Sequence, residues 1–160
     1  MKNLNKVFIA ILFVAIFSYS ADAKPRRSVK KPPAQITKVV DYKGGTDLIS
    51  MASRFIGQTA RQIGLPPTLW CADFIGLLTK GGTHSRAALS YKNYGKPAQT
   101  GCVNCIAVLT RKGGGHVGIV KGYDRGGNPI LISGNHGNRV AISSYSKNRV
   151  VAYRYPPGIS

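Results

Sequence analysis

Acidic residues are nearly absent from this chain. It has five Asp and no Glu against 23 Lys and Arg, which gives a formal net charge of +18 over 160 residues. Such an excess draws a protein to polyanions by a long-range attraction that salt screens. The sequence also lacks an apolar run of the roughly 20 residues that a membrane-spanning helix needs. We therefore expect no transmembrane segment in the mature protein. We expect its partner to be a polyanion. The alternative is a protein whose basic surface binds no specific anion.

The amino terminus has the pattern of a secretory signal peptide. Lys2 and Lys6 precede an unbroken apolar run of eleven residues, 7–17, and a small-x-small sequence, Ala-Asp-Ala, follows at 21–23. These parts are typical of a peptide that is removed on export, so we assign residues 1–23 to it. An uncleaved membrane anchor is the alternative, but the run has about half the length of a span. The sequence therefore predicts a periplasmic or extracellular protein.

Export also restricts the partners. An exported bacterial protein meets wall polymers, anionic lipid and lipopolysaccharide rather than nucleic acid, and no nucleic-acid-binding motif is recognisable. We expect peptidoglycan and the other anionic polymers of the cell envelope as partners. Residues 24–43 are predicted to be a basic, Pro-containing linker, because 24–40 carry six basic residues and no acid. Such a segment repels itself and stays extended. Residues 44–160 then form one folded domain.

Cysteine is scarce, and its spacing separates a pair from a single thiol. Cys102 and Cys105 form a C-x-x-C pair that can close a local disulfide in an oxidising compartment. A structural zinc would need further Cys or His ligands nearby in the sequence, and none are there. A thioredoxin-like motif would open a helix, whereas this pair leads into the apolar run 106–109. No metal and no cofactor are predicted, and Cys71 remains as the unpaired thiol.

Helical periodicity fills the first half of the domain and two-residue alternation fills the second half. A helix is expected from a cap at Thr46 to just before Gly64, a second from a cap at Thr68 to Leu78, and a short helical piece over 85–94. Five strands are expected after them, separated by Gly, Asn and Asp, at 105–110, 116–121, 129–134, 139–145 and 150–155. Helices first and strands after predict an α+β domain with an antiparallel sheet.

Cys71 lies where a helix would favour a nucleophile. If Thr68 caps the second helix, Cys71 falls in its first turn. Unpaired backbone N–H groups and the positive end of the helix dipole favour the thiolate there, and thiolate is the attacking form of cysteine. The alternative is a small buried hydrophobe, since Cys71 stands beside Trp70 and shortly before Phe74.

His116 is the residue that we expect to act as the base. It opens an apolar strand directly after the glycines 113–115. Alternation places His116 on one face with Gly118, whose missing side chain lets another element approach that face closely. A histidine that is merely hydrogen-bonded at a strand end is the alternative.

The hairpin between the second and third strands predicts a third site residue. A turn centred on 125–126 pairs residues whose numbers add to 251, which places Asn135 opposite His116 on the same face. Asn135 would then accept the ring N–H and fix the orientation of the imidazole. His136 is the other candidate for this orienting role, but in this register it faces the other way. A turn centred one residue later would place Gly137 opposite instead.

Three segments in order resemble the NlpC-type and CHAP-type papain-like hydrolases of bacteria. They are Leu-Trp-Cys-Ala-Asp-Phe at 69–74, Gly-Gly-Gly-His-Val-Gly-Ile-Val at 113–120 and Ile-Ser-Gly-Asn-His at 132–136. The resemblance covers roughly 46–156. More specifically, the chain resembles a subfamily with a W-C-A-x-F helix start, a G-H-V-G strand and a G-N-[QH] turn. It implies a papain-like fold, in which the nucleophile begins a helix that packs on a small antiparallel sheet. It implies Cys71 as nucleophile, His116 as base and Asn135 as the orienting residue.

The same resemblance implies hydrolysis of amide bonds in peptidoglycan, by a stem-peptide endopeptidase or an amidase. Two positions depart from the family. Ser133 stands where related CHAP domains often have an acid, and 104–106 read Asn-Cys-Ile where relatives commonly have Gly-Asp-Ile. Trp70 and His136 are candidates for lining a substrate groove, with packing of Trp70 beneath the helix as an equal alternative. Two other functions stay open: a catalytically inactive basic protein that binds the wall, and an acyltransferase that uses the Cys–His pair on lipids.

Overall fold

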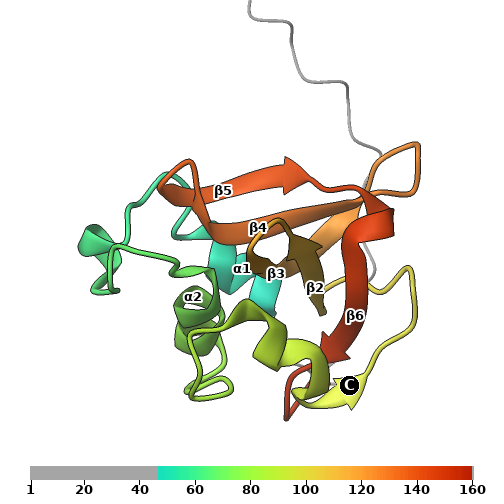
Figure 1. Cartoon of the computed structure of the whole chain (residues 1–160), viewed down its shortest axis with the longest axis horizontal. Coiled ribbons are helices and arrows are strands. Elements are labelled where there is room, and N and C mark those ends of the chain that lie inside the picture. Colours follow the sequence, from blue (N-terminus) through green and yellow to red (C-terminus); the bar gives the residue numbers. More distant parts are fainter. Residues whose placement is uncertain (1–46, 160) are drawn as a thin grey trace, which may run out of the picture. The chain divides into compact units, whose positions relative to one another are not determined.

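Six strands form one antiparallel sheet in residues 47–159, the part of the chain that this computed structural model describes (Figure 1). Along the sheet their order is β1-β6-β2-β3-β4-β5. The strands are β1 (Lys96–Pro97), β2 (Ile106–Arg111), β3 (Gly114–Tyr123), β4 (Pro129–His136), β5 (Arg139–Ser144) and β6 (Val150–Tyr155). The helical segments are α1 (Leu48–Ser53), η1 (Arg61–Ile63), α2 (Cys71–Leu78), η2 (Ala88–Asn93) and η3 (Lys147–Arg149). The prediction of an α+β domain with an antiparallel sheet is confirmed. The predicted signal peptide, 1–23, and linker, 24–43, lie outside the described residues.

The five predicted strands correspond to β2 through β6. Gly, Asn and Asp separate these segments in the sequence. The central strands are covered on both faces, since the first four residues of β2 and the first six of β4 are buried. The sequence did not predict β1, whose two residues are too few to show a period. This strand exists because Lys96 and Pro97 pair with the last two residues of β6.

The first helix is much shorter than predicted. It begins after Asp47, whose carboxylate accepts the Ser50 N–H at 3.1 Å, and it ends at Ser53. The predicted cap, Thr46, lies outside the described residues. After α1 the backbone turns away to pair with β5: the Gly57 N–H donates to the Val140 carbonyl oxygen, and the Val140 N–H donates to Gln58, both at 2.8 Å. These long-range bonds outweigh the helical periodicity that continues to Ile63.

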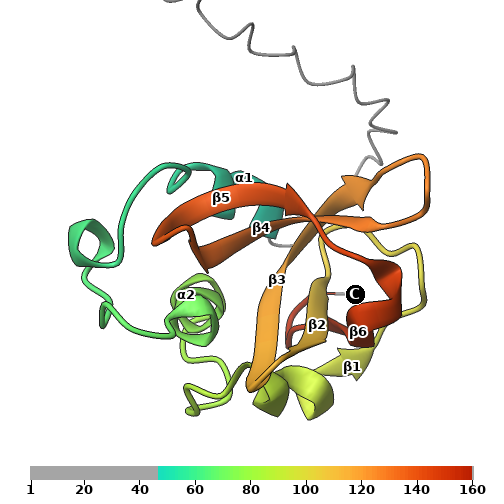
Figure 2. The same cartoon turned by 45° about the horizontal axis from the view of Figure 1, so that its top comes forward.

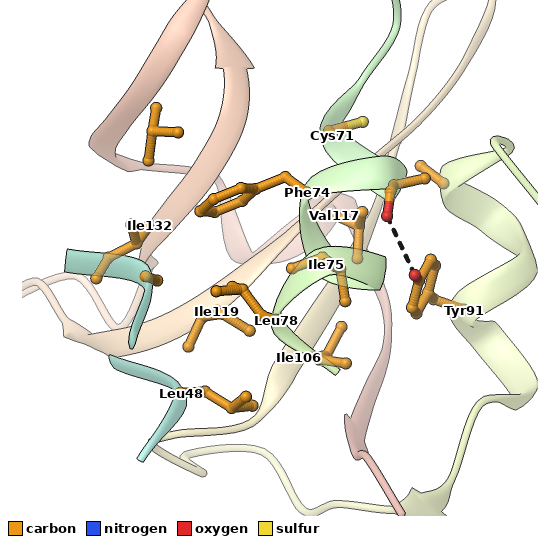
Figure 3. Packing of buried hydrophobic residues seen from close by; sticks show 14 of the residues in the cluster. Leu48, Cys71, Phe74, Ile75, Leu78, Tyr91, Ile106, Val117, Ile119 and Ile132 are labelled. Atoms are coloured by element: carbon orange, nitrogen blue, oxygen red, sulfur yellow. Dashed lines mark hydrogen bonds between the residues drawn. The ribbon is translucent and has the colours of Figure 1, made fainter. Parts of the chain in front are cut away.

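The sheet coils strongly, and α2 packs against its inner face. β4 and β5 run at a steep angle to β2 and β3, as expected from the twist of paired strands (Figure 2). α2 contacts both β3 and β4. Apolar side chains of α2 meet those of the strands in the main core (Figure 3), which includes Phe74, Ile75, Leu78, Val117, Ile119 and Ile132. The opposite face of the sheet carries a second cluster, with Ala107, Leu109, Val120 and Leu131 under partly buried tyrosines.

Two contacts set the position of the helix start. Tyr91 of η2 is buried, and its hydroxyl donates to the Ala72 carbonyl oxygen at 3.1 Å (Figure 3). On the other side, β4 approaches α2 at Gly134, where an added Cβ would stand 2.6 Å from the Trp70 ring and 2.8 Å from the Phe74 Cβ. Only glycine allows this approach, so the first turn of α2 is held directly against the sheet.

The three cysteines divide as their spacing suggests. The structure joins Cys102 and Cys105 in a disulfide, and Cys71 is a free, buried thiol. None of the helices in residues 47–159 has the length and apolar character needed to cross a bilayer.

Candidate active site

Cys71 is the first residue of α2, but the predicted side-chain cap is wrong. Trp70 occupies the cap position and makes no side-chain cap bond. Thr68 cannot cap because Leu69 turns the chain with a left-handed backbone, φ 52°. Arg86 holds this turn instead: its guanidinium donates to the Thr68 carbonyl oxygen and to the Asp73 carboxylate, the latter at 3.0 Å. The entry to the helix is therefore fixed by a residue 15 positions after the thiol.

The resting form of Cys71 is the thiol. Its side chain is 2 % exposed, and this burial raises the pKa of the Cys71 thiol above its ordinary value. The backbone N–H groups of Val117, Ala72 and Cys71 and the charge of Arg111 act in the opposite direction and lower the pKa, but they do not outweigh burial. The sequence correctly predicted that N–H groups at the helix start favour the thiolate, but it could not account for desolvation, which raises the pKa of the Cys71 thiol by more than these groups lower it.

His116 is a buried and neutral imidazole. It is 5 % exposed, and burial, followed by the charges of Arg111, His136 and Arg149, lowers the pKa of His116 to about 4. Its Nε2 forms a 3.1 Å hydrogen bond with the Tyr145 hydroxyl. The two rings stack with centroids 5.1 Å apart and planes 27° from parallel. The ring is thus held in one orientation.

The structure brings Cys71 and His116 into one site. Val117, the next residue along β3 after His116, directs its N–H at the Cys71 sulfur. Tyr145, which bonds the His116 ring, has a raised pKa chiefly because of burial, and negative charge on Cys71 raises this pKa further. The charge of Arg111 acts on both Cys71 and His116. A thiol and a fixed imidazole from separate elements therefore share one environment.

Tyr145 makes the bond that was predicted for Asn135. The predicted register holds for Ile119–Ile132 and Val120–Leu131, whose numbers add to 251. Nearer the turn it is wrong by one residue, because a bulge lies between Val120 and Gly122 and the last two pairs add to 252. In residues 47–159, however, no hydrogen bond joins Asn135 to His116. Asn135 has a left-handed backbone, φ 59°, and the pairing of β4 with β5 shifts by one residue at this point. Such a bulge breaks the alternation on which the prediction for Asn135 depended.

The same bulge corrects the prediction that His136 faces away from the site. His136 Nδ1 lies 2.9 Å from the Tyr145 hydroxyl, and its Nε2 lies 2.9 Å from the Ser143 hydroxyl. Ser133, one of the departures from the family, is fully buried and reaches the same tyrosine hydroxyl at 3.3 Å. The series Ser143–His136–Tyr145–His116, which we call the histidine–tyrosine chain, uses both ring nitrogens of His136. His136 therefore supports His116 rather than lining a groove.

Trp70 belongs to the core and not to a substrate groove. It has no exposed surface, and its ring packs edge-on against Phe74 with centroids 6.4 Å apart. The alternative, packing beneath the helix, is the one that the structure shows.

An open cleft of about 230 Å³ lies beside the thiol. Cys71 contributes to its lining together with Leu69, Arg86, Leu89, Arg111 and the glycines 113–115. The glycine wall presents only backbone, and Leu69 is 60 % exposed. The thiol is buried, yet it borders a space that a ligand can enter.

Sequence reasoning missed Tyr145 and Arg111. Tyr145 follows β5 and lies 29 positions from the histidine it bonds, so no local pattern connects them. Arg111 ends β2 and is one of 23 basic residues in the chain, which hides it in the composition. The run of glycines in the same hairpin, where Gly114 pairs with Arg111, was the available signal.

The site thus combines a buried thiol at a helix start, an oriented imidazole and an adjoining cleft. No group of three His, Cys, Asp or Glu that could hold a metal ion occurs in the part of the chain that the structure describes. No family model matches the chain, and no curated protein matches its sequence.

Proposed function

We propose that this protein is an exported cysteine hydrolase with a papain-like fold, and that it cleaves amide bonds of bacterial peptidoglycan as a stem-peptide endopeptidase or an amidase. One observation carries the proposal: the single free thiol begins a helix, borders an open cleft and shares its site with an imidazole whose Nε2 is held. A nucleophile, a base and a group that orients the base are the parts that acyl transfer requires.

The first half of the reaction begins from neutral partners. Because Tyr145 occupies Nε2 of His116, Nδ1 is the ring nitrogen that accepts the thiol proton as the sulfur attacks the carbonyl carbon. An S–C bond forms, and negative charge develops on the carbonyl oxygen. The N–H groups of Cys71, Ala72 and Val117, which now face the sulfur, are the donors available to that oxygen.

The second half returns the enzyme to its starting state. Protonated His116 gives its proton to the amine as the C–N bond breaks, which leaves a thioester on Cys71. His116 then takes a proton from water while the water oxygen attacks the thioester carbonyl. Collapse of that intermediate releases the carboxylic acid and restores the thiol.

The histidine–tyrosine chain suits this cycle. If His116 carries its proton on Nε2, it donates to the Tyr145 oxygen, and the Tyr145 hydroxyl donates to Nδ1 of His136. The remaining His136 N–H then donates to Ser143. Every bond in the series is satisfied, and Nδ1 of His116 stays unprotonated and ready to accept the thiol proton.

Charge supports the wall as the substrate. Residues 47–159 carry fourteen Lys and Arg against three Asp, and the segment that precedes them is also basic. This excess would hold the enzyme on anionic envelope polymers. Export, which the amino-terminal pattern predicts, would bring the protein into the compartment of those polymers.

Release of fragments from purified sacculi tests the function. The wild-type protein should release new muropeptides, identified by mass spectrometry, whereas Cys71→Ala and His116→Asn should release none. His84→Asn is the matched control, because His84 is an exposed histidine in the loop after α2, and it should act like the wild type. Equal release by wild type and Cys71→Ala would refute the proposal.

Absence of release from every sample would also refute hydrolysis and would leave two distinguishable alternatives. Sedimentation of an inactive protein with sacculi would indicate a wall-binding protein. A thioester on Cys71 that forms with lipid acyl donors and not with wall fragments would indicate an acyltransferase.

A further inference from the structure

Arg111 is a cation at the candidate site that no protein carboxylate neutralises. It lies at the end of β2 and lines the cleft beside Cys71. The three carboxylates within residues 47–159 are all engaged elsewhere: Asp47 at the start of α1, Asp73 with Arg86, and Asp124 within the turn 124–128. In this part of the chain no hydrogen bond or ion pair engages the Arg111 guanidinium.

The neighbouring guanidinium groups are already occupied. Arg86 also lines the cleft, but it pairs with Asp73 and the Thr68 carbonyl oxygen. Arg149 donates from Nε to the Thr110 carbonyl oxygen at 2.8 Å, and its guanidinium carbon lies 5.9 Å from the centre of the Tyr145 ring. Arg111 is therefore the cleft cation that is free to meet a ligand.

Arg111 is close enough to act on both reacting groups. Its charge lowers the pKa of the Cys71 thiol against the larger effect of burial, and it adds to burial in lowering the pKa of His116. Arg111 and Cys71 also line the same cleft, so a group that pairs with Arg111 lies in the space that the thiol borders. The other walls of the cleft, Leu69, Leu89 and the glycines 113–115, offer no competing side-chain charge.

We propose that Arg111 is a substrate-binding residue that selects amides carrying a free carboxylate beside the scissile bond. That Arg111 binds a substrate rests on the proposed function. That Arg111 binds an anion does not depend on it. Guanidinium and carboxylate form paired, charge-assisted hydrogen bonds, which a neutral carboxamide cannot match. Wall peptides with a free carboxylate at this position are the preferred substrates, and their amidated counterparts are poor ones.

Two alkylating agents of nearly equal size test the anion site directly. Iodoacetate carries a carboxylate, and iodoacetamide carries the neutral carboxamide. Each forms an S–C bond with Cys71, with loss of iodide from carbon and of the thiol proton to solvent. The unreduced protein has Cys71 as its one free thiol, so mass spectrometry of the labelled peptide follows each rate. The ratio of the two rates cancels any change in thiol pKa that a variant causes.

The iodoacetate to iodoacetamide ratio should fall about tenfold in Arg111→Gln relative to the wild type. Lys112→Gln is the matched control, because it removes the adjacent charge of the same hairpin but does not line the cleft, and it should keep the wild-type ratio. Equal ratios in the wild type and Arg111→Gln overturn the anion site, as does an equal fall in Lys112→Gln.

The same variants separate this inference from the hydrolase proposal. Sacculi whose carboxylates have been converted to carboxamides should be digested more slowly by the wild type, and Arg111→Gln should digest both preparations equally slowly. If muropeptides are released but the iodoacetate to iodoacetamide ratio does not depend on Arg111, the anion site is refuted and the hydrolase proposal stands. If the iodoacetate to iodoacetamide ratio depends on Arg111 but no muropeptides are released, the anion site stands and the hydrolase proposal is refuted.

Discussion

Burial of His116 gives the folded protein a pH dependence that can be worked out from the structure. The ring is 5 % exposed, and desolvation, followed by nearby cations, lowers the pKa of His116 from 6.5 to about 4. The unfolded chain therefore binds this proton at a higher pH than the folded protein does. Between pH 6.5 and 4 the unfolded state carries more protons, so the free energy of unfolding falls as the pH falls. One pKa unit corresponds to about 1.4 kcal/mol, so we expect a loss of about 3 kcal/mol between pH 7 and pH 4.

Few other groups in residues 47–159 titrate in that window. This part of the chain has no Glu and only three Asp. Hydrogen bonds, chiefly from Ser144 and Asn128, lower the pKa of Asp124 to about 2, and a hydrogen bond with Ser50 lowers the pKa of Asp47. The loss of stability between pH 6.5 and 4 should therefore follow the protonation of His116.

Urea unfolding followed by tryptophan fluorescence measures the loss, because the single Trp of the chain is buried in the main core. Unfolding curves at pH 7, 6, 5 and 4 are compared for the wild type, His116→Gln and His84→Asn. For each protein the free energy of unfolding at lower pH is compared with its own value at pH 7, so that a change in packing caused by the substitution cancels. His116→Gln should keep most of the stability that the wild type and His84→Asn lose. An equal loss in His116→Gln would show that this ring does not control the acid sensitivity.

Three further outcomes follow from particular contacts. Gly134→Ala should lower the free energy of unfolding by about 2 kcal/mol, because its Cβ would stand 2.6 Å from a buried indole ring. In Gly122→Ala nothing lies within 4 Å of the new Cβ, so urea unfolding should differ from the wild type by less than about 0.5 kcal/mol; similar values for the two variants would contradict the packing argument. Tyr145→Phe should change stability by only about 1 kcal/mol but slow hydrolysis about tenfold or more, since the imidazole loses its fixed orientation. A wild-type rate and pH profile in that variant, from steady-state kinetics, would exclude a positioning role. Under denaturing conditions iodoacetamide should label one cysteine before reduction and three after it, and replacing both Cys102 and Cys105 by Ser should cost about 2 kcal/mol; labelling of more than one site before reduction would argue against the bond.

Local pattern was sufficient for most of the sheet and for the two principal site residues. Strand positions could be predicted because Gly, Asn and Asp separate the apolar segments. The hairpin register is as predicted around Ile119 and Ile132, but a bulge shifts it by one residue next to the turn. Cys71 could be recognised because a helix begins there, and His116 because it follows a run of glycines near the start of an apolar strand. The first helix was overestimated because bonds from Gly57 and Gln58 to a distant strand compete with helical propensity.

What the sequence determined by itself is the class of the fold, the segments that form the main strands and the choice of one thiol and one imidazole as candidates, since these depend on residue types and patterns over a few residues. Tertiary structure alone decided which groups surround them. Because of a one-residue bulge near Asn135, Tyr145 and not the expected Asn135 bonds His116. Burial raises the pKa of the Cys71 thiol, which the helix start was expected to lower. Both results depend on contacts between segments far apart in the chain, where a shift of one residue reverses the direction of a side chain and the loss of water changes its charge.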